Sequence, residues 1–218
     1  NYREANTRLL VLKDNWSGLV MDGSESNISE IQKQDIYWRH SVQARAAFVT
    51  KDNINSLINE YAKGREIGLL SVDIDGCDYW VWQAVEVIKP CIVIAEYNSL
   101  FGSERAITIP YNEKFTRQEA HSSNLYYGAS LRALEVLGKS KNYSLVGSNS
   151  AGNNAFFVRN DVLGSLKPVS AEEAYVQSQF RESRTNSGTL SFLPFLEAQK
   201  LIRGLSVWNV ATQKIEEF

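Results

Sequence analysis

The sequence predicts an α/β protein built on a doubly wound, mostly parallel sheet. Two short apolar runs, residues 69–72 and 91–95, each end in acidic residues, and such runs are typical of strands buried on both faces. Between them, residues 79–88 carry apolar side chains at helical spacing, and Pro90 ends this segment. Apolar runs and helical segments also alternate in the preceding part of the chain. Short loops between such elements favour parallel strands with helices on both faces.

The first 96 residues are expected to alternate between helix and strand. Helices are indicated by one-sided apolar spacing and by capping residues such as Ser24 and Asp52, and strands by unbroken apolar runs. The expected helices are residues 6–13, a segment beginning at 24, 53–63 and 79–88, and the expected strands are residues 16–21, 42–49, 69–72 and 91–96. Helices that connect successive strands are what a parallel sheet requires.

The pattern changes after Asn98. Residues 99–127 are polar and aromatic without a clear period, which is typical of a lid or substrate loop in a compact domain. A helix is expected at 130–137, followed by an antiparallel hairpin of 143–146 with 155–158 at the edge of the sheet.

The chain is expected to divide into an α/β domain, residues 1–165, and a helical C-terminal extension, residues 166–218, packed on the same domain. Helical pieces are indicated at 171–180 and 192–205 of the extension. The chain opens on what resembles the body of a helix with no strand before it, so we expect the α/β domain to be N-terminally incomplete.

Composition excludes several classes of function. The 218 residues carry a formal net charge of −2, which does not indicate broad binding to nucleic acid or anionic membranes. No apolar run is long enough to span a bilayer. Cys77 and Cys91 flank the 79–88 helix in apolar surroundings, which favours free buried thiols in a reducing compartment over a disulfide. We therefore expect a cytoplasmic protein.

Acidic residues follow two strands that the pattern predicts to be neighbours. Asp73, Asp75 and Asp78 follow the first, and Glu96 and Asn98 follow the second. The C-terminal ends of parallel strands form the edge where ligands bind, and clustered acids there suit Mg²⁺, Ca²⁺ or a general base. The alternative is that the acids are turn and cap residues. For the whole cluster, its position favours function.

Asp22 offers a second candidate site. It ends the strand expected at 16–21, just before a helix, where a carboxylate binds the ribose hydroxyls of nucleoside cofactors in doubly wound sheets. The alternative of a turn residue or helix cap has equal weight, because Asp favours both positions.

The loop of residues 99–127 is expected to recognise a polar, ring-shaped substrate such as a sugar, because tyrosine and arginine side chains suit that task. Those side chains are Arg105, Tyr111, Arg117, Tyr126 and Tyr127. His121 is a candidate acid/base in this loop, with a surface histidine as the commoner alternative.

Four segments carry a resemblance to a known family. LLSVDIDGCDYWVWQAV (residues 69–85) followed by PCIVIAEYN (90–98) resembles the FkbM-type methyltransferases, a branch of the S-adenosylmethionine-dependent class I methyltransferase fold. WSGLVMDGSESNI (16–28) is similar to the second strand of that Rossmann-like fold, and residues 141–161 resemble its closing strand pair. The resemblance covers about residues 1–161, with its parts in the right order.

The resemblance implies methyl transfer from S-adenosylmethionine to an oxygen of a small-molecule or glycan acceptor. On the cofactor side, it implies that Asp22 holds the ribose, with Gly23 and Ser24 beside it, and that Phe48 flanks the adenine. Asp73 would face the methyl centre.

On the acceptor side, the resemblance implies that Asp75 and Glu96 act as base or metal ligands, with His121 as a further catalytic candidate. Some sugar O-methyltransferases of this fold use Mg²⁺, and Asp75, Glu96 and Asn98 are the set that would hold it here. The family's glycine-rich cofactor loop and the strand before it are absent from this sequence, and we expect them upstream of Asn1.

Two alternatives stay open. Asp73-Ile74-Asp75 also resembles the Asp-x-Asp motif with which many glycosyltransferases hold a metal against a sugar nucleotide. A binding or scaffold domain that keeps the fold without the cofactor is the non-enzymatic alternative. The sequence also leaves open whether the protein forms a homo-oligomer.

Overall fold

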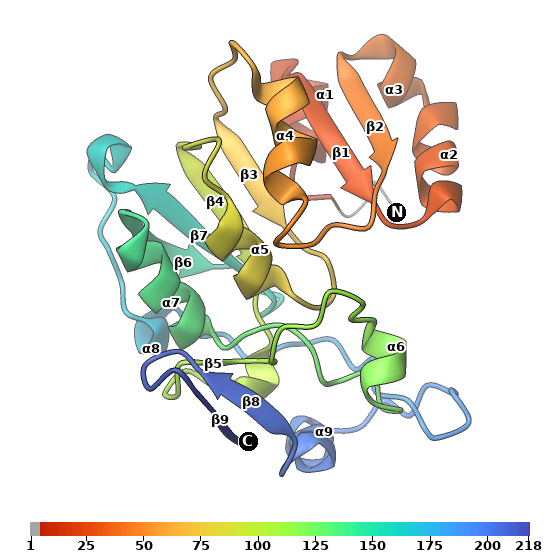
Figure 1. Ribbon diagram of the computed structural model, residues 1–218, viewed down its shortest axis with the longest axis vertical. Helices are drawn as coiled ribbons and strands as arrows, with labels where there is room; N and C mark the ends of the chain where they lie inside the picture. The colour runs from red at the N-terminus through yellow and green to blue at the C-terminus, as the bar shows by residue number, and fades with distance from the viewer. Residues whose placement is uncertain (1–4) are drawn as a thin grey trace.

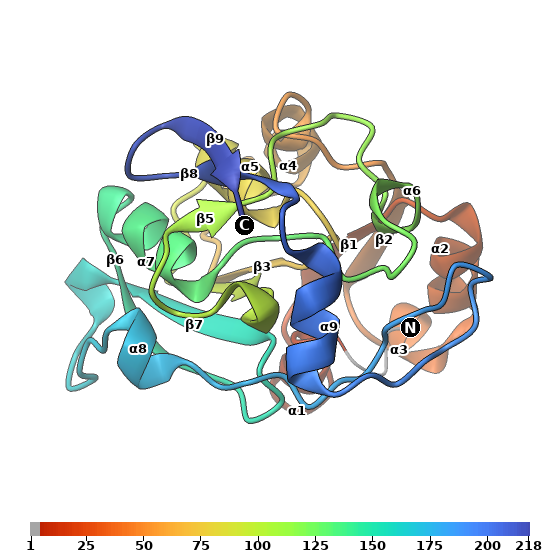
Figure 2. The ribbon, with the colours of Figure 1, turned by 90° about the horizontal axis from the view of Figure 1, so that it is seen from below.

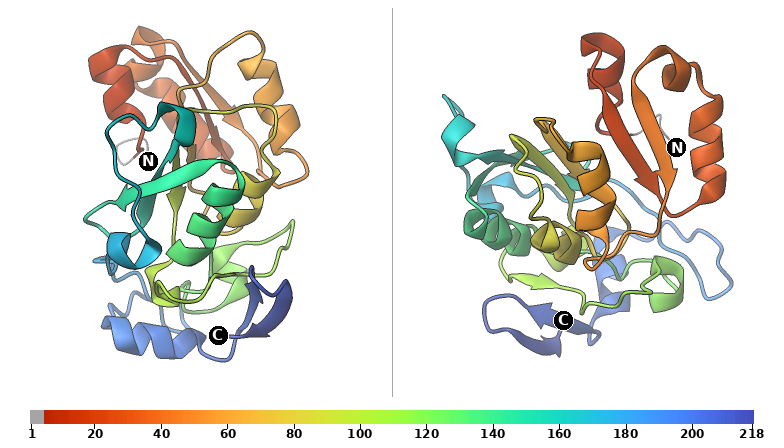
Figure 3. Two further views of the ribbon diagram at one scale, coloured as in Figure 1. Left: turned by 90° about the vertical axis from the view of Figure 1, so that its left-hand side faces the viewer. Right: turned by 45° about the horizontal axis from the view of Figure 1, so that its top comes forward.

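A computed structural model describes residues 5–218 of the chain. They form an α/β structure with three small sheets: one of two strands, one of four and one of three. The α/β class is confirmed, but the expectation of a single, mostly parallel sheet is wrong. Figures 1 and 3 show the two-stranded sheet and the C-terminal hairpin at opposite ends of the molecule, with the four-stranded sheet between them.

The two-stranded sheet is parallel and has its own small core. Strands β1 and β2 pair in a register that sets Gly18 opposite Val42. The elements of this part are α1 (Arg8–Asp14), β1 (Gly18–Asp22), α2 (Glu25–Lys33), α3 (Asp35–Arg39) and β2 (Val42–Ala46). Its core consists of Val11, Ile28, Ile31, Ile36 and Val42. The apolar spacing that predicts these helices therefore marks the side chains that they bury.

The four-stranded sheet is mixed, in the order β3-β4-β7-β6. Its strands and helices are α4 (Ile54–Ala62), β3 (Leu69–Val72), α5 (Asp78–Ala84), β4 (Ile92–Glu96), α7 (Leu131–Ser140), β6 (Tyr143–Ser148) and β7 (Asn154–Arg159). β3 and β4 are parallel, whereas β7 runs antiparallel to both β4 and β6. The predicted hairpin is thus confirmed. A tight β6–β7 connection reverses the chain, and this reversal makes the sheet mixed.

The main core lies between this sheet and its helices, with Trp82 at its centre. The Trp82 side chain is 1% exposed, and its ring centroid lies 4.8 Å from that of Phe157. Gly138 on α7 makes this packing possible, because a Cβ there would lie 2.9 Å from the Phe157 ring. Helix α7 can therefore approach the sheet only without a side chain at this position.

Side chains, rather than backbone pairing, connect the two-stranded sheet to the four-stranded one. Within residues 5–218, β1 pairs only with β2, and β3 pairs only with β4. The Trp16 ring packs on Gly68, where an added Cβ would lie 2.9 Å away, and Asn6 Nδ2 donates to Ser71 Oγ at 3.1 Å. The expected continuous sheet is interrupted because no strand of the described chain lies between β1 and β3.

The extension of residues 166–218 contains less helix than expected. Its elements are α8 (Ala171–Ala174), α9 (Phe195–Ile202), β8 (Ser206–Asn209) and β9 (Lys214–Glu217). Strand β8 pairs with both β9 and the short β5 (Ile107–Thr108). Figure 1 shows α9 and the β8–β9 hairpin at the bottom of the molecule, and Figure 2 views the molecule from that side. A second core, which includes Leu100, Ile107, Ile202 and Val207, joins the extension to the rest.

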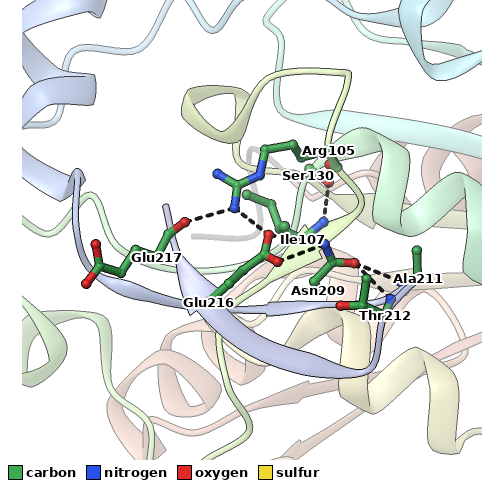
Figure 4. Close-up of polar contacts among 8 residues, drawn as sticks. All are labelled: Arg105, Ile107, Ser130, Asn209, Ala211, Thr212, Glu216 and Glu217. Atoms are coloured by element: carbon green, nitrogen blue, oxygen red, sulfur yellow. Dashed lines mark hydrogen bonds and ion pairs between the residues drawn. The ribbon is translucent and has the colours of Figure 1, made fainter.

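An ion pair fixes the C-terminal hairpin (Figure 4). Arg105 donates from Nη2 to Glu216 Oε1 at 2.5 Å and to the Glu217 carbonyl oxygen at 2.9 Å. Glu216 also accepts from Asn209 Nδ2 at 3.1 Å. Arg105, one of the expected substrate-binding arginines, thus has a structural role in the three-stranded sheet.

Two further expectations concern the cysteines and the membrane. Cys77 and Cys91 are both free, as predicted, but only Cys77 is buried, whereas Cys91 is partly exposed. Among residues 5–218, no helix combines the length and the apolar character needed to cross a bilayer.

Candidate functional site

Acidic side chains meet where β3 and β4 end. The parallel register sets Val72 opposite Ala95, so Asp73 and Glu96 occupy the next position of two neighbouring strands. Residues at matched positions of parallel strands point to the same side of the sheet. The predicted edge of acidic residues therefore exists, with Asp73 and Glu96 at its centre.

Two cavities share this edge. The first, of about 250 Å³, lies between the ends of β1 and β2 and the loop after β3, and its lining includes Asp22, Gly23 and Phe48. The second, of about 740 Å³, is lined by Glu96 and by two later segments, residues 149–154 and 177–183. Asp73 and Asp75 line both cavities. These two carboxylates thus form the boundary at which groups bound in the two cavities would meet.

Asp22 serves in a turn and also lines the first cavity. Its carboxylate accepts from the Ser24 backbone N–H at 2.7 Å and from Asn27 Nδ2 at 3.0 Å. Ser24 caps α2 by accepting from the Asn27 N–H, and it does not line the cavity. The Phe48 ring would lie 3.5 Å from a Cβ at Gly23, which is an ordinary van der Waals contact, so this packing does not require glycine. Both interpretations of Asp22 therefore agree with the structure.

Asp73 lies between the two cavities, where its side chain reaches solvent but is partly desolvated by the protein around it. The pKa of Asp73 is raised from 3.8 to about 6, mainly by desolvation. The negative charge of Asp75 contributes to this rise, and the positive charge of Arg117 opposes it. None of the side-chain hydrogen bonds found among residues 5–218 uses its oxygens. A carboxylate with a pKa near neutrality and an unused acceptor suits proton transfer.

Glu96 is buried, and one of its two carboxylate oxygens is unpaired within residues 5–218. Its side chain lines the second cavity, and Oε2 has no hydrogen-bond partner among the described residues. Burial raises the pKa of Glu96 well above its usual value, and the charges of Asp73 and Asp78 add to this rise. An unpartnered buried carboxyl group is costly, so it indicates a position that a ligand satisfies.

Asp78 has a structural role. Its two carboxylate oxygens accept the backbone N–H groups of Ile74, at 2.8 Å, and Gly76, at 3.0 Å. Burial and the charge of Asp73 raise the pKa of Asp78 to about 7, while these hydrogen bonds oppose the rise. Asp78 therefore fixes the turn that carries Asp73 and Asp75, as the cap-residue alternative predicts.

Two of the three expected Mg²⁺ ligands, Asn98 and Asp75, are engaged elsewhere. Asn98 donates from Nδ2 to the carbonyl oxygens of Leu125 and Tyr127, at 2.9 and 3.0 Å, and Oδ1 accepts from the Leu100 N–H. Asp75 pairs with Arg117. In the described part of the chain, no group of three His, Cys, Asp or Glu residues is placed to hold a metal ion. These side chains do not fit the octahedral oxygen cage that Mg²⁺ requires.

Arg117 is one of two arginines, with Arg181, that line the second cavity. It begins α6 (Arg117–Ala120), and its side chain is 12% exposed. The guanidinium pairs with Asp75 and Glu182 and lies 4.1 Å from the centroid of the Tyr127 ring. The sequence singles out Arg117 for substrate recognition, but its contacts with side chains of three distant segments could not be foreseen.

His121 and Tyr126 lie outside both cavities. The His121 Nδ1 atom is 2.7 Å from Ser123 Oγ, at the end of α6, and the Tyr126 hydroxyl donates to the Ser206 carbonyl oxygen. Neither residue lines the first or the second cavity. Tyr111, by contrast, lines the first cavity, and its hydroxyl donates to Asp52. The structure therefore does not bring His121 to the acidic edge.

Sequence reasoning missed the later segments that line the second cavity. Residues 149–154 form the β6–β7 turn, and residues 177–183 belong to the extension. The only signal for the turn is its run of Asn, Ser and Gly, which predicts a connection rather than a cavity wall.

No family model, curated protein or solved structure matches this chain. The function is therefore inferred from the two cavities and the carboxylates between them.

Proposed function

We propose that the protein is an S-adenosylmethionine-dependent O-methyltransferase for a small polar acceptor, a carbohydrate or glycan-related hydroxyl. One observation carries the proposal: Asp73 lies between a cavity lined by Asp22 and Phe48 and a second cavity lined by Glu96, whose Oε2 has no partner in the described part of the chain. Methyl transfer requires two bound molecules to meet, and two cavities that share one edge suit this requirement.

The first cavity has residues that fit the nucleoside part of the cofactor. Asp22 is a carboxylate at the end of a parallel strand, where ribose hydroxyls donate to it, and Phe48 offers an aromatic face for adenine. When bound, the cofactor supplies an activated methyl group. The negative charge of Asp73 and Asp75 at the far side of this cavity suits its positive sulfonium.

The second cavity has groups that bind an acceptor hydroxyl and take its proton. Asp73, with a pKa raised to about 6, is largely ionised at neutral pH and can accept that proton. Glu96 retains its proton at higher pH than an ordinary glutamate does, so its carboxyl group can orient a neighbouring hydroxyl. Glu96 is buried, which limits its contact with water and strengthens this interaction.

Calorimetry with S-adenosylhomocysteine in EDTA tests the proposal. We expect binding without added metal, and an affinity at least about tenfold lower for Asp22→Asn because a charged hydrogen bond to ribose is lost. Asp35→Asn is the matched control, since Asp35 is an exposed acid on α3 that lines neither cavity.

The same titration separates the proposal from its rivals. Binding of a nucleotide diphosphate that requires Mn²⁺ would instead favour a glycosyltransferase. A folded protein that binds neither ligand would contradict both enzymatic functions and leave a binding or scaffold domain.

A further inference from the structure

Arg117 connects the two cavities through a fork of hydrogen bonds. Nη1 donates to Asp75 Oδ1 at 2.7 Å, and Nη2 donates to Glu182 Oε2 at 2.9 Å. Nε donates to the Asn124 carbonyl oxygen, and the guanidinium lies over the Tyr127 ring. A planar guanidinium can hold two carboxylates in a fixed geometry, which a lysine cannot do.

The two carboxylates belong to different parts of the site. Asp75 lines both cavities and stands in the turn after β3, with a left-handed φ of 54°. Glu182 lines only the second cavity and lies in the segment of residues 177–183. Asp75 and Glu182 are 62% and 54% exposed, whereas Arg117 is 12% exposed. One shielded cation is therefore shared between two carboxylates that face solvent.

Sharing makes the two ion pairs compete. When Asp75 is neutralised or bound by a ligand in the first cavity, its hold on Arg117 weakens, and the guanidinium attracts Glu182 more strongly. Arg117 keeps its orientation in that case, because Asn124 and Tyr127 still contact it. Neutralising Asp75 therefore changes the strength of the Arg117–Glu182 attraction and leaves the geometry of that ion pair unchanged.

We propose that Arg117 is a positioning residue that couples the two cavities, so that a ligand on Asp75 in the first cavity draws the segment of residues 177–183 closer onto the second. Coupling of this kind is reciprocal: removing the charge of Glu182 strengthens the Arg117–Asp75 pair and lowers the affinity of the first cavity for a ligand that needs Asp75. Only the identity of that ligand rests on the proposed function.

A double-mutant cycle followed by amide hydrogen exchange tests the coupling without any ligand. In Asp75→Asn, we expect exchange of residues 177–183 to slow about two- to fivefold, the range set by partly exposed ion pairs. In Arg117→Gln, exchange in this segment is faster than in the wild type, and adding Asp75→Asn has no further effect. Asp35→Asn serves as the control and leaves the segment unchanged.

A purely structural role for Asp75 gives the opposite sign, because its loss would loosen the loop and speed the exchange. Faster or unchanged exchange in Asp75→Asn, or slowing that persists without Arg117, overturns the proposal. Should Arg117→Gln fail to fold, Arg117→Lys replaces it, since a lysine keeps the charge but cannot hold both carboxylates at once.

Calorimetry supplies the reciprocal measurement. The probe is S-adenosylmethionine, because its positive sulfonium is the group that needs the charge of Asp75. Glu182→Gln is expected to weaken its binding about two- to fivefold when Arg117 is present, and to have no effect in the Arg117→Gln background. Equal effects in both backgrounds contradict the coupling. Absence of all binding would contradict the proposed methyltransferase function, while the exchange cycle would still decide the role of Arg117.

Discussion

The carboxylate of Asp78 accepts the backbone N–H of Ile74 at 2.8 Å and thereby fixes the turn that presents Asp73 and Asp75. A second hydrogen bond, from Gly76, occupies its other oxygen. Asp78→Asn keeps one acceptor but places an amide N–H against the Gly76 N–H. We expect a loss of about 1–3 kcal/mol in the free energy of unfolding, measured by urea denaturation. A loss below about 0.5 kcal/mol would mean that the turn is stable without this clamp.

Asp73 should make the free energy of unfolding depend on pH. Its folded pKa is raised from 3.8 to about 6, so the fold retains this proton more tightly than the unfolded chain does. The stabilisation is complete below pH 3.8 and is lost as pH rises through about 6. Asp73→Asn, which has no such proton to lose, should gain stability relative to wild type between pH 4.5 and pH 8. The gain should be about 1 kcal/mol, because solvent screens a side chain that is exposed. A difference that stays constant across this range would contradict the raised pKa of Asp73.

The same group predicts the pH profile of methyl transfer. If Asp73 takes the acceptor proton, kcat/KM should rise with pH and level off above about 6, where the carboxylate is ionised. Asp73→Asn should lower kcat by about 100-fold or more and remove this rise. Transfer assays with radiolabelled methyl donor measure both. An unchanged profile in the variant would assign the proton to another group.

Gly152 separates two backbone segments that line the second cavity. Its φ is +79°, and a Cβ there would lie 2.7 Å from backbone atoms of Gln177 and Ser178. Gly164 has a φ of +59° but nothing within 4 Å. Gly164→Ala should therefore cost only the left-handed strain, about 1–2 kcal/mol, and Gly152→Ala at least about 1 kcal/mol more. Equal costs in thermal unfolding would show that the two segments move apart freely.

Trp82 and Trp38 test the position of the main core. Trp82 is 1% exposed beside Phe157, whereas Trp38 on α3 is 68% exposed. Trp82→Ala should cost about 3–5 kcal/mol, and Trp38→Ala within about 0.5 kcal/mol of zero. Denaturant titration of both variants compares these losses directly, and a large loss at Trp38 would indicate packing that the structure does not contain.

Much of the fold up to Glu96 follows from the sequence, because its strands are continuous apolar runs. The runs at residues 69–72 and 91–96 correspond to β3 (Leu69–Val72) and β4 (Ile92–Glu96). The strands β5, β8 and β9 could not be predicted in this way. β9 reads Lys-Ile-Glu-Glu and has no apolar period, and its stability comes from pairing with β8 and from the Arg105–Glu216 ion pair.

The candidate site was predictable in part for the same reason. Asp22 and Asp73 lie at the ends of strands, a position that predicts a shared ligand site, and both side chains line the first cavity. Arg117 and His121 lie in an irregular segment whose shape depends on contacts far along the chain. Arg117 reaches Glu182, 65 residues away, and no local pattern encodes that distance.

Because the core around β1 and β2 is separate from the main core, the first cavity lies between two separately packed parts of the molecule. Asp22 and Phe48 lie on one side of it and Asp73 on the other, and the two sides belong to different sheets. A nucleoside bound there acts as a noncovalent crosslink between two independently packed bodies. Ligand binding should then stabilise the contact between the two bodies and slow the local unfolding of α2 and its neighbours. Amide hydrogen exchange in these helices would therefore detect the bound state, although they do not all contact the ligand.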